Sequence, residues 1–153
     1  TSCQYALVIL DWEGCGREEQ QSLADLEKEL QEKLEKNGWK DRCCVIVIDP
    51  ELEAWVWTDS PHVPEVLGWR AELGALKEWL TRRGFLQPGQ PKPSPPKEAM
   101  EEVLRETGTV RSSALYKELA QKVSIKHCTD PAFRKLTDTL RKWFSPEGLE
   151  LKR

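Results

Sequence analysis

The clearest pattern in the chain is YALVILDWEGCG, residues 5–16. Six apolar residues, from Tyr5 to Leu10, are followed by two acids one residue apart, Asp11 and Glu13, and then by two glycines. A continuous apolar run of this length is typical of a buried strand, and the glycines after it indicate a turn. The two acids therefore lie where a strand ends. Either an ordinary acidic turn or a divalent metal site would explain them.

The residues that follow predict a β-α-β unit. Residues 17–36 carry leucines at spacings of three, four and four, which is typical of an amphipathic helix, and Asn37-Gly38 ends the pattern. A second continuous apolar run, CCVIVI, occupies residues 43–48. Strands that are apolar throughout are characteristic of parallel sheets covered on both faces. We therefore expect an α/β fold with a right-handed crossover between the two strands.

The second half of the sequence predicts helices. The segment QPGQPKPSPP, residues 87–96, is rich in proline, which lacks a backbone donor, so we interpret it as an extended and mobile linker. We expect an α/β core at 1–86, this linker, and a helical C-terminal region at 97–153 that packs on the core. The patterns predict a short segment at 51–57 and helices at 70–83, 97–106, 113–123 and 130–144.

The composition limits the function classes. The 153 residues include 32% charged residues and have a formal net charge of −3, so any contact with nucleic acid needs a local patch or a metal. The apolar runs are far shorter than the ~20 residues of a membrane helix, and no signal-peptide pattern is found. The five cysteines are an odd number, which fits reduced thiols. We therefore expect a cytoplasmic protein that does not enter a membrane.

Acidic residues also follow the second predicted strand. Asp49, Glu51 and Glu53 come directly after it. Ligands of open α/β sheets bind beyond the carboxyl ends of the strands, so parallel neighbours would bring these acids to the same edge as Asp11 and Glu13. A divalent cation would relieve their mutual repulsion, and oxygen ligands without histidine or thiolate favour Mg²⁺ or Mn²⁺ over zinc. The alternative is an acidic turn after the first strand, with Glu51 and Glu53 as first-turn acids stabilised by a helix dipole.

Two motifs resemble those of the Toprim fold, the metal-binding domain of topoisomerases, primases and overcoming-lysogenization-defect nucleases. The first is Asp11-Trp12-Glu13 after a strand, where the Toprim pattern is usually Asp-x-Asp. The second is Glu51-Leu52-Glu53-Ala54-Trp55 after the next strand. The segments PPK, SSALYKELA and CTDPAFRKLTDTLRKWF are similar to the helical tail of small bacterial Toprim-like proteins. The resemblance therefore covers nearly the whole chain.

The resemblance implies a Toprim-like, Rossmann-like parallel sheet. It also implies metal-dependent phosphodiester chemistry on nucleic acid, as in a nuclease of a phage-defence or mobile-element system. In such a nuclease Asp11 and Glu13 would bind Mg²⁺ or Mn²⁺, and Glu53 would be a ligand or position a water. Lys97, which opens a predicted helix, would neutralise a phosphate. Asp49 and Glu51 would support this site.

One part of the Toprim pattern is not found. A Toprim nuclease also uses a glutamate after an earlier strand, in a pattern like V-E-G-x-T-E, whereas this sequence begins with Thr1 directly before the first strand. Three explanations stay open: a fragment that lacks this strand, a protein partner that supplies the glutamate, or a reduced module that has lost catalysis and serves in binding. A non-catalytic interaction subunit is therefore the alternative to a nuclease.

Overall fold

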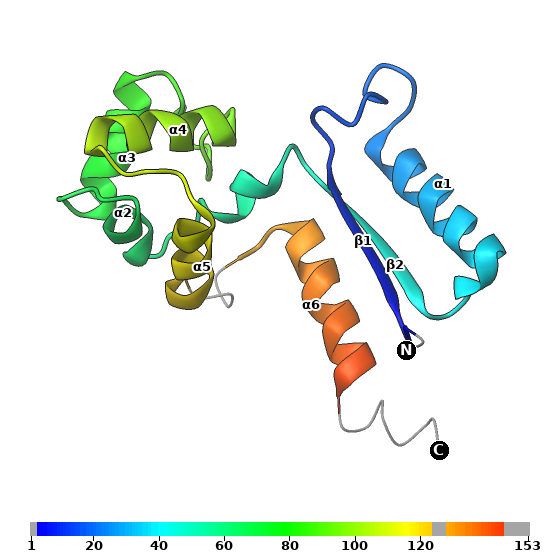
Figure 1. Cartoon of the computed structure of the whole chain (residues 1–153). Coiled ribbons are helices and arrows are strands. Elements are labelled where there is room, and N and C mark those ends of the chain that lie inside the picture. The colour runs from blue at the N-terminus through cyan, green and yellow to red at the C-terminus, as the bar shows by residue number, and fades with distance from the viewer. Residues whose placement is uncertain (1–2, 124–127, 146–153) are drawn as a thin grey trace. The chain divides into compact units, whose positions relative to one another are not determined.

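The computed structural model describes residues 3–123 and 128–145, and these residues form a two-stranded sheet and six α-helices (Figure 1). The described residues group into two compact units. Unit 1 contains the described residues of 1–49 and 129–153, and unit 2 contains those of 50–128. The elements are β1 (Ala6–Asp11), α1 (Leu23–Leu34), β2 (Cys43–Ile48), α2 (His62–Val66), α3 (Leu73–Arg82), α4 (Pro96–Thr107), α5 (Ser113–Lys122) and α6 (Pro131–Phe144).

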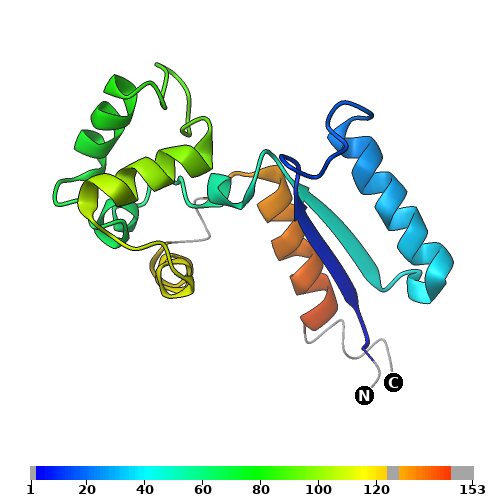
Figure 2. The ribbon, with the colours of Figure 1, turned by 45° about the horizontal axis from the view of Figure 1, so that its top comes forward.

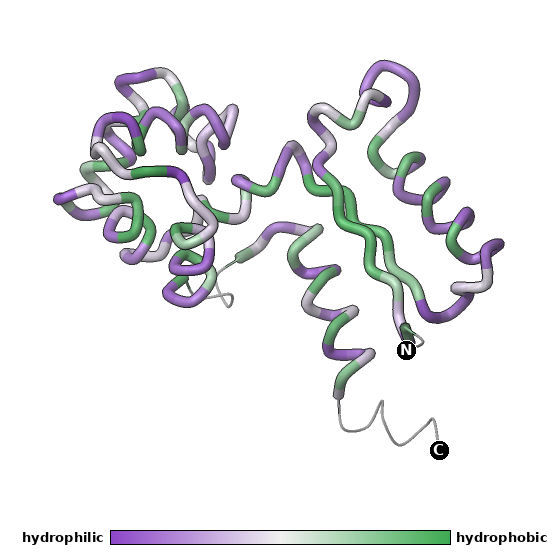
Figure 3. The backbone as a smooth tube through the Cα atoms, in the orientation of Figure 1, coloured by the Kyte–Doolittle hydropathy of each residue, from purple (hydrophilic) through white to green (hydrophobic). Residues whose placement is uncertain are grey.

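The two strands are parallel neighbours, as their apolar runs predict. The register pairs Ala6 with Cys43 and Asp11 with Ile48. Five of the six residues of β2 are buried, whereas β1 is only partly buried. Figure 3 shows both strands as continuous hydrophobic segments. The prediction of a β-α-β unit followed by C-terminal helices is confirmed, with two strands in the part of the chain that the structure describes.

Two helices of unit 1 cover opposite faces of this sheet (Figure 2). Val8 of β1 packs with Leu26 of α1, and Leu7 packs with Trp143 of α6. Neighbouring side chains of a strand point to opposite faces, so each helix buries one alternate set. The sequence predicted that the helical region at 97–153 packs on the core, but it did not predict which helix covers which face of the sheet. The structure shows that α6 covers the second face of the sheet in the β-α-β unit.

Helix boundaries follow the capping residues. The helix predicted from residue 17 begins at Leu23, because the Ser22 side chain accepts a hydrogen bond from the Asp25 backbone N–H and caps the helix there. Asp130 caps α6 in the same way, since its side chain accepts hydrogen bonds from the Ala132 and Phe133 backbone N–H groups. The short helix α2 was not expected, since its five residues contain Pro64.

Unit 2 is a group of helices around one apolar core. Buried side chains of this core include Leu76 of α3, Val103 of α4 and Leu119 of α5. Residues 87–96, interpreted from sequence as a linker, join α3 to α4 inside this unit, and the Ser94 N–H donates to the Phe85 carbonyl at 2.7 Å. The two units therefore divide the chain at other positions than 86 and 97. None of the described helices has the length and apolar character needed to span a bilayer.

Candidate functional site

Three of the predicted acids lie at the carboxyl edge of the sheet in unit 1. Asp11 is the last residue of β1, Glu13 lies two residues further, and Asp49 directly follows β2. The Trp12 N–H donates to the Ile48 carbonyl at 2.8 Å, so the parallel pairing continues up to this edge. The strand ends that the sequence predicted to be neighbours are neighbours. Asp11, Glu13 and Asp49 are termed the edge acids below.

The edge acids differ in their surroundings. Asp11 is partly buried, whereas Glu13 and Asp49 are exposed and make no hydrogen bond or ion pair with any described residue. The turn that carries Glu13 is closed by Glu18, whose carboxylate accepts a hydrogen bond from the Gly14 N–H at 2.6 Å. Backbone hydrogen bonds lower the pKa of Glu18. Gly14 has a φ of 81°, which favours glycine at this position.

The edge acids offer oxygen ligands but no complete protein cage. Within residues 3–123 and 128–145, no three His, Cys, Asp or Glu side chains converge closely enough to hold a metal ion. Trp12 packs on the α1 side of the sheet, so strand alternation places Asp11 on the α6 side. Mg²⁺ is commonly held by one or two carboxylates while it keeps several waters. The donor chemistry of Asp11 and Glu13 fits such a partly hydrated Mg²⁺ or Mn²⁺ ion.

Glu53 lies in unit 2, in a 3-10 helix formed by Leu52–Trp55. Its side chain is 5% exposed. The Oε1 atom of Glu53 accepts two hydrogen bonds, from Arg111 Nη2 at 2.7 Å and from the Tyr116 hydroxyl at 2.6 Å. The Oε2 atom accepts none from the described residues. The Oε1 atom of this buried carboxylate is therefore held by two donors, and the Oε2 atom can still accept a hydrogen bond.

The two donors to Glu53 also contact each other. Arg111 Nε donates to the Tyr116 hydroxyl at 2.9 Å, and the guanidinium lies 5.7 Å from the centre of the Tyr116 ring. Burial and the hydrogen bond to Glu53 raise the pKa of Tyr116 to about 12, so its hydroxyl keeps its proton at neutral pH. The hydrogen bond to Tyr116 raises the pKa of Arg111. Arg111 also pairs with Glu101 of α4 at 3.1 Å. Glu53, Arg111 and Tyr116 are termed the Glu53 network.

The sequence interpretation missed Arg111 and Tyr116. They lie 58 and 63 residues from Glu53, so no local spacing connects them. One signal was available. A glutamate inside an apolar segment needs donors if it is buried, because an unpaired buried charge is costly. The sequence alone could not show which of many cations and hydroxyls supplies them.

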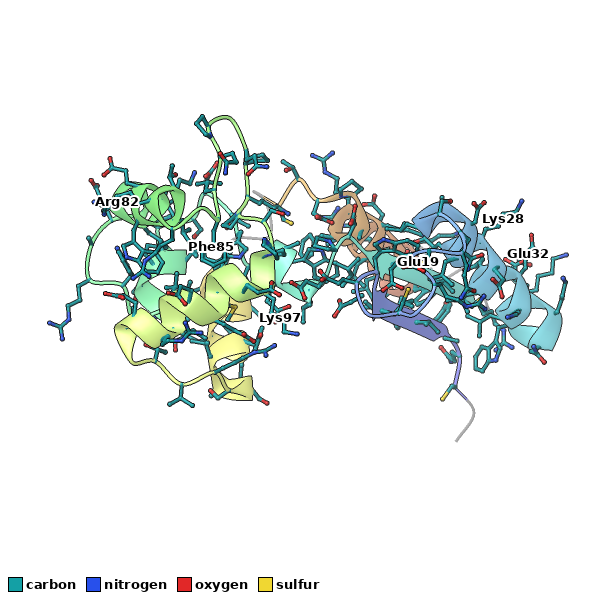
Figure 4. The ribbon with its side chains drawn as sticks, turned by 90° about the horizontal axis from the view of Figure 1, so that it is seen from above. Glu19, Lys28, Glu32, Arg82, Phe85 and Lys97 are labelled. Atoms are coloured by element: carbon teal, nitrogen blue, oxygen red, sulfur yellow. The ribbon has the colours of Figure 1, made fainter. Side chains whose placement is uncertain are left out.

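Glu51 and Lys97 meet through the backbone. Glu51 is buried, and its Oε1 accepts a hydrogen bond from the Lys97 N–H at 2.9 Å in the first turn of α4. A carboxylate at a helix N-terminus is stabilised by the unpaired N–H groups and the dipole there. Lys97 is labelled at this end of α4 in Figure 4, and its amine makes no ion pair within the described chain. The acid thus caps α4, a helix 46 residues away, rather than its own 3-10 helix.

No family model, curated protein or solved structure matches this chain. The likeness of its motifs to Toprim domains therefore stays a prediction. The edge acids and the Glu53 network are the structural features from which a function can be proposed.

Proposed function

We propose that this chain carries out Toprim-like, metal-dependent phosphodiester chemistry on nucleic acid, with Mg²⁺ or Mn²⁺ held by Asp11 and Glu13. The observation that carries the proposal is the parallel register of β1 and β2, which pairs Asp11 with Ile48 and brings both strand ends to one edge. This edge is where ligands of open α/β sheets bind. The acid pattern along the sequence adds support.

The edge acids suit such a role through their different exposure. A bound cation would supply charge neutralisation at a phosphate oxygen and lower the pKa of a bound water. Asp11 is partly buried at the end of a hydrogen-bonded strand, so its position is well fixed. Glu13 lies in a turn closed by Glu18 and has its carboxylate in solvent, where a cation can reach it. Asp49, also exposed, would hold a water of the hydrated ion.

For unit 2 by itself, the proposal assigns the positioning of a water to Glu53 and the neutralisation of a phosphate to Lys97. The support for Glu53 is that Arg111 and Tyr116 orient its carboxylate through one oxygen, while the other oxygen remains an open acceptor within the described chain. Carboxylate oxygens accept hydrogen bonds from water. The support for Lys97 is an amine without an ion-pair partner in the described chain.

A non-catalytic interaction subunit is the second candidate. The observation that favours it is that Glu51 and Glu53 both make structural hydrogen bonds inside unit 2. Glu51 caps α4, and Glu53 accepts hydrogen bonds from Arg111 and Tyr116. Buried acids with such partners can be wholly structural. In that case replacing Glu53 would destabilise unit 2 without any effect that depends on metal or nucleic acid.

A thermal-shift titration with Mg²⁺ and Mn²⁺ tests the metal site. Binding to the native state alone stabilises it by about 2.7 kcal/mol at a hundredfold excess over Kd, so millimolar metal should raise Tm. Glu13→Gln should abolish the shift and leave the stability of the metal-free protein unchanged, because Glu13 makes no hydrogen bond or ion pair with the described residues. Glu19→Gln is the matched control, since Glu19 is also an exposed glutamate but is not one of the edge acids (Figure 4).

Cleavage assays separate the two candidate functions. The nuclease predicts that DNA or RNA is cut only with metal, that EDTA stops the reaction, and that Asp11→Asn abolishes it. A wild-type chain without any metal-dependent shift in Tm would refute the metal site. A metal-dependent shift without cleavage of DNA or RNA would support the interaction subunit.

A further inference from the structure

The outer edge of β2 is closed by side chains of α1. The Val45 N–H donates to Gln31 Oε1 at 3.1 Å. The Val47 N–H donates to Glu27 Oε1, also at 3.1 Å. Lys135 of α6 then pairs with the other oxygen of Glu27 at 2.8 Å. These bonds occupy the backbone donors that another strand would need, so this edge is protected against pairing.

The outer edge of β1 has no such cover. The N–H groups of Ala6 and Trp12 point to β2, so in a parallel ladder the alternate residues Leu7 and Ile9 direct their backbone groups outward. In the part of the chain that the structure describes, neither a strand nor a side chain binds these groups. The Ile9 side chain beside them is 41% exposed. An uncovered strand edge is a template for pairing with another strand.

The flank of α6 beside this edge is also apolar. Thr139 contacts the Cys44 sulfur of β2 at 3.4 Å, which fixes the rotation of the helix. At about 100° per residue, Leu140 and Phe144 lie on the flank directed away from β2. The ring of Phe144 lies 5.6 Å from that of Tyr5, which precedes β1. Leu140 is 38% exposed and Phe144 is 60% exposed.

We propose that two copies of this chain associate through this surface, with β1 pairing antiparallel to β1 of the second copy. Among the described residues of unit 1, the exposed large hydrophobic side chains are Ile9, Leu140 and Phe144, and all three border the open edge. A twofold axis places the same patch on both partners, so each apolar surface covers its copy. The result is a four-stranded sheet with both α6 helices on one face.

The contacts given above set the register of this pairing. Thr139 touches Cys44, and Cys44 is the partner of Leu7 in the sheet, so Leu140 lies level with Leu7. A twofold axis near Leu7 therefore brings Leu140 against Leu140 of the second copy and places Ile9 beside the second Tyr5. Because α6 lies over β2, strands about 4.8 Å apart put the two α6 helices roughly 14 Å apart, so Leu140 of each copy reaches across the space between them.

Charge and size agree with a second copy as the occupant. The two Asp11 residues are about 27 Å apart in this register, well beyond the screening length of about 8 Å at physiological salt. Lys135 reaches toward Glu27 on the β2 side, away from the interface. An interface made of one strand edge and one helix flank should fall at the small end of specific interfaces, below about 1,200 Å² in total. We therefore expect a dimer that depends on concentration.

Sedimentation velocity of the full chain over a range of concentrations tests the proposal. The wild type should shift from monomer to dimer, and Leu140→Lys should weaken association by at least about tenfold, because it puts a charge against its own copy. Val110→Lys is the matched control, since Val110 is 77% exposed in unit 2 and should leave the dimer intact. Exchange of the Leu7 and Ile9 amides should slow as the concentration rises.

Three results would overturn the proposal. One is a wild type that stays monomeric up to millimolar concentration. Another is a monomer whose Leu7 and Ile9 amides are protected, which would mean that another segment of the same chain occupies the edge. The last is a dimer that Leu140→Lys does not weaken, which would place the interface elsewhere.

Discussion

Replacing Arg111 by alanine should destabilise unit 2 by about 2 kcal/mol, because hydrogen bonds to charged groups contribute about 1.5–3 kcal/mol. The replacement removes the donor 2.7 Å from Glu53 Oε1 and leaves the Tyr116 hydroxyl as the remaining partner. It also removes the guanidinium from the Tyr116 ring. The Glu53 carboxylate then stays buried with one donor fewer.

The exposure of the two partners sets this magnitude. Breaking a fully buried ion pair costs about 3–5 kcal/mol, because it leaves an uncompensated charge. The Glu53 side chain is 5% exposed, but that of Arg111 is 44% exposed, so solvent already screens the pair. Water can also enter where the guanidinium was. The loss should therefore fall below the range for buried pairs and above that for surface pairs.

Urea denaturation followed by circular dichroism measures the effect. Arg141→Ala is the matched control, because Arg141 pairs with Asp138 at 3.5 Å and both side chains are about three-quarters exposed. That loss should stay below about 1 kcal/mol. Adding Glu53→Gln to Arg111→Ala should restore part of the stability, since it removes the unpaired charge. An Arg111→Ala loss within about 0.5 kcal/mol of the control would refute the argument that Glu53 depends on this donor.

Two further predictions concern unit 2. The pKa of Tyr116 is raised to about 12, so its contribution to stability is present below the usual tyrosine value of about 10 and is lost as pH rises from 10 through 12. Ultraviolet titration should show a tyrosinate phase near pH 12 that Tyr116→Phe removes, and its absence from the wild type would contradict this environment. Gly68→Ala should destabilise more than Gly84→Ala. Both glycines have positive φ, which costs an alanine about 1–2 kcal/mol. Only at Gly68 would the new Cβ also collide with a side chain, that of Thr109. Equal losses in urea denaturation would show that Thr109 moves aside freely.

The strands and their pairing could be predicted because their pattern is local and extreme. CCVIVI is apolar at six successive positions, and five of them are buried between α1 and α6. The helix between the strands gave an equally clear leucine pattern. Its first residue was missed because a serine cap acts over three residues, whereas the apolar period averages over many. Caps such as Ser22 and Asp130 are the local signals that correct such boundaries.

The contacts of Glu53 could not be predicted, because they join residues far apart in sequence. The same holds for α6, whose Trp143 reaches a sheet formed about 95 residues earlier, as the contact between Thr139 and Cys44 shows. The pattern of α6 predicted an amphipathic helix but not the surface it covers. The edge acids could be predicted in part. Their position at the strand ends followed from sequence, whereas the metal and the substrate remain proposals.

Because unit 2 is inserted between β2 and α6, the chain begins one unit and completes another before it finishes the first. During synthesis, β1, α1 and β2 leave the ribosome long before Trp143. Until α6 is synthesised, the face of the sheet that carries Cys44 and Ile46 therefore stays uncovered. Domains usually fold as units and in order from the N-terminus. We therefore expect the inserted helices to fold before unit 1 is complete, and we expect the uncovered face of the sheet to bind chaperones or start aggregation until α6 is synthesised.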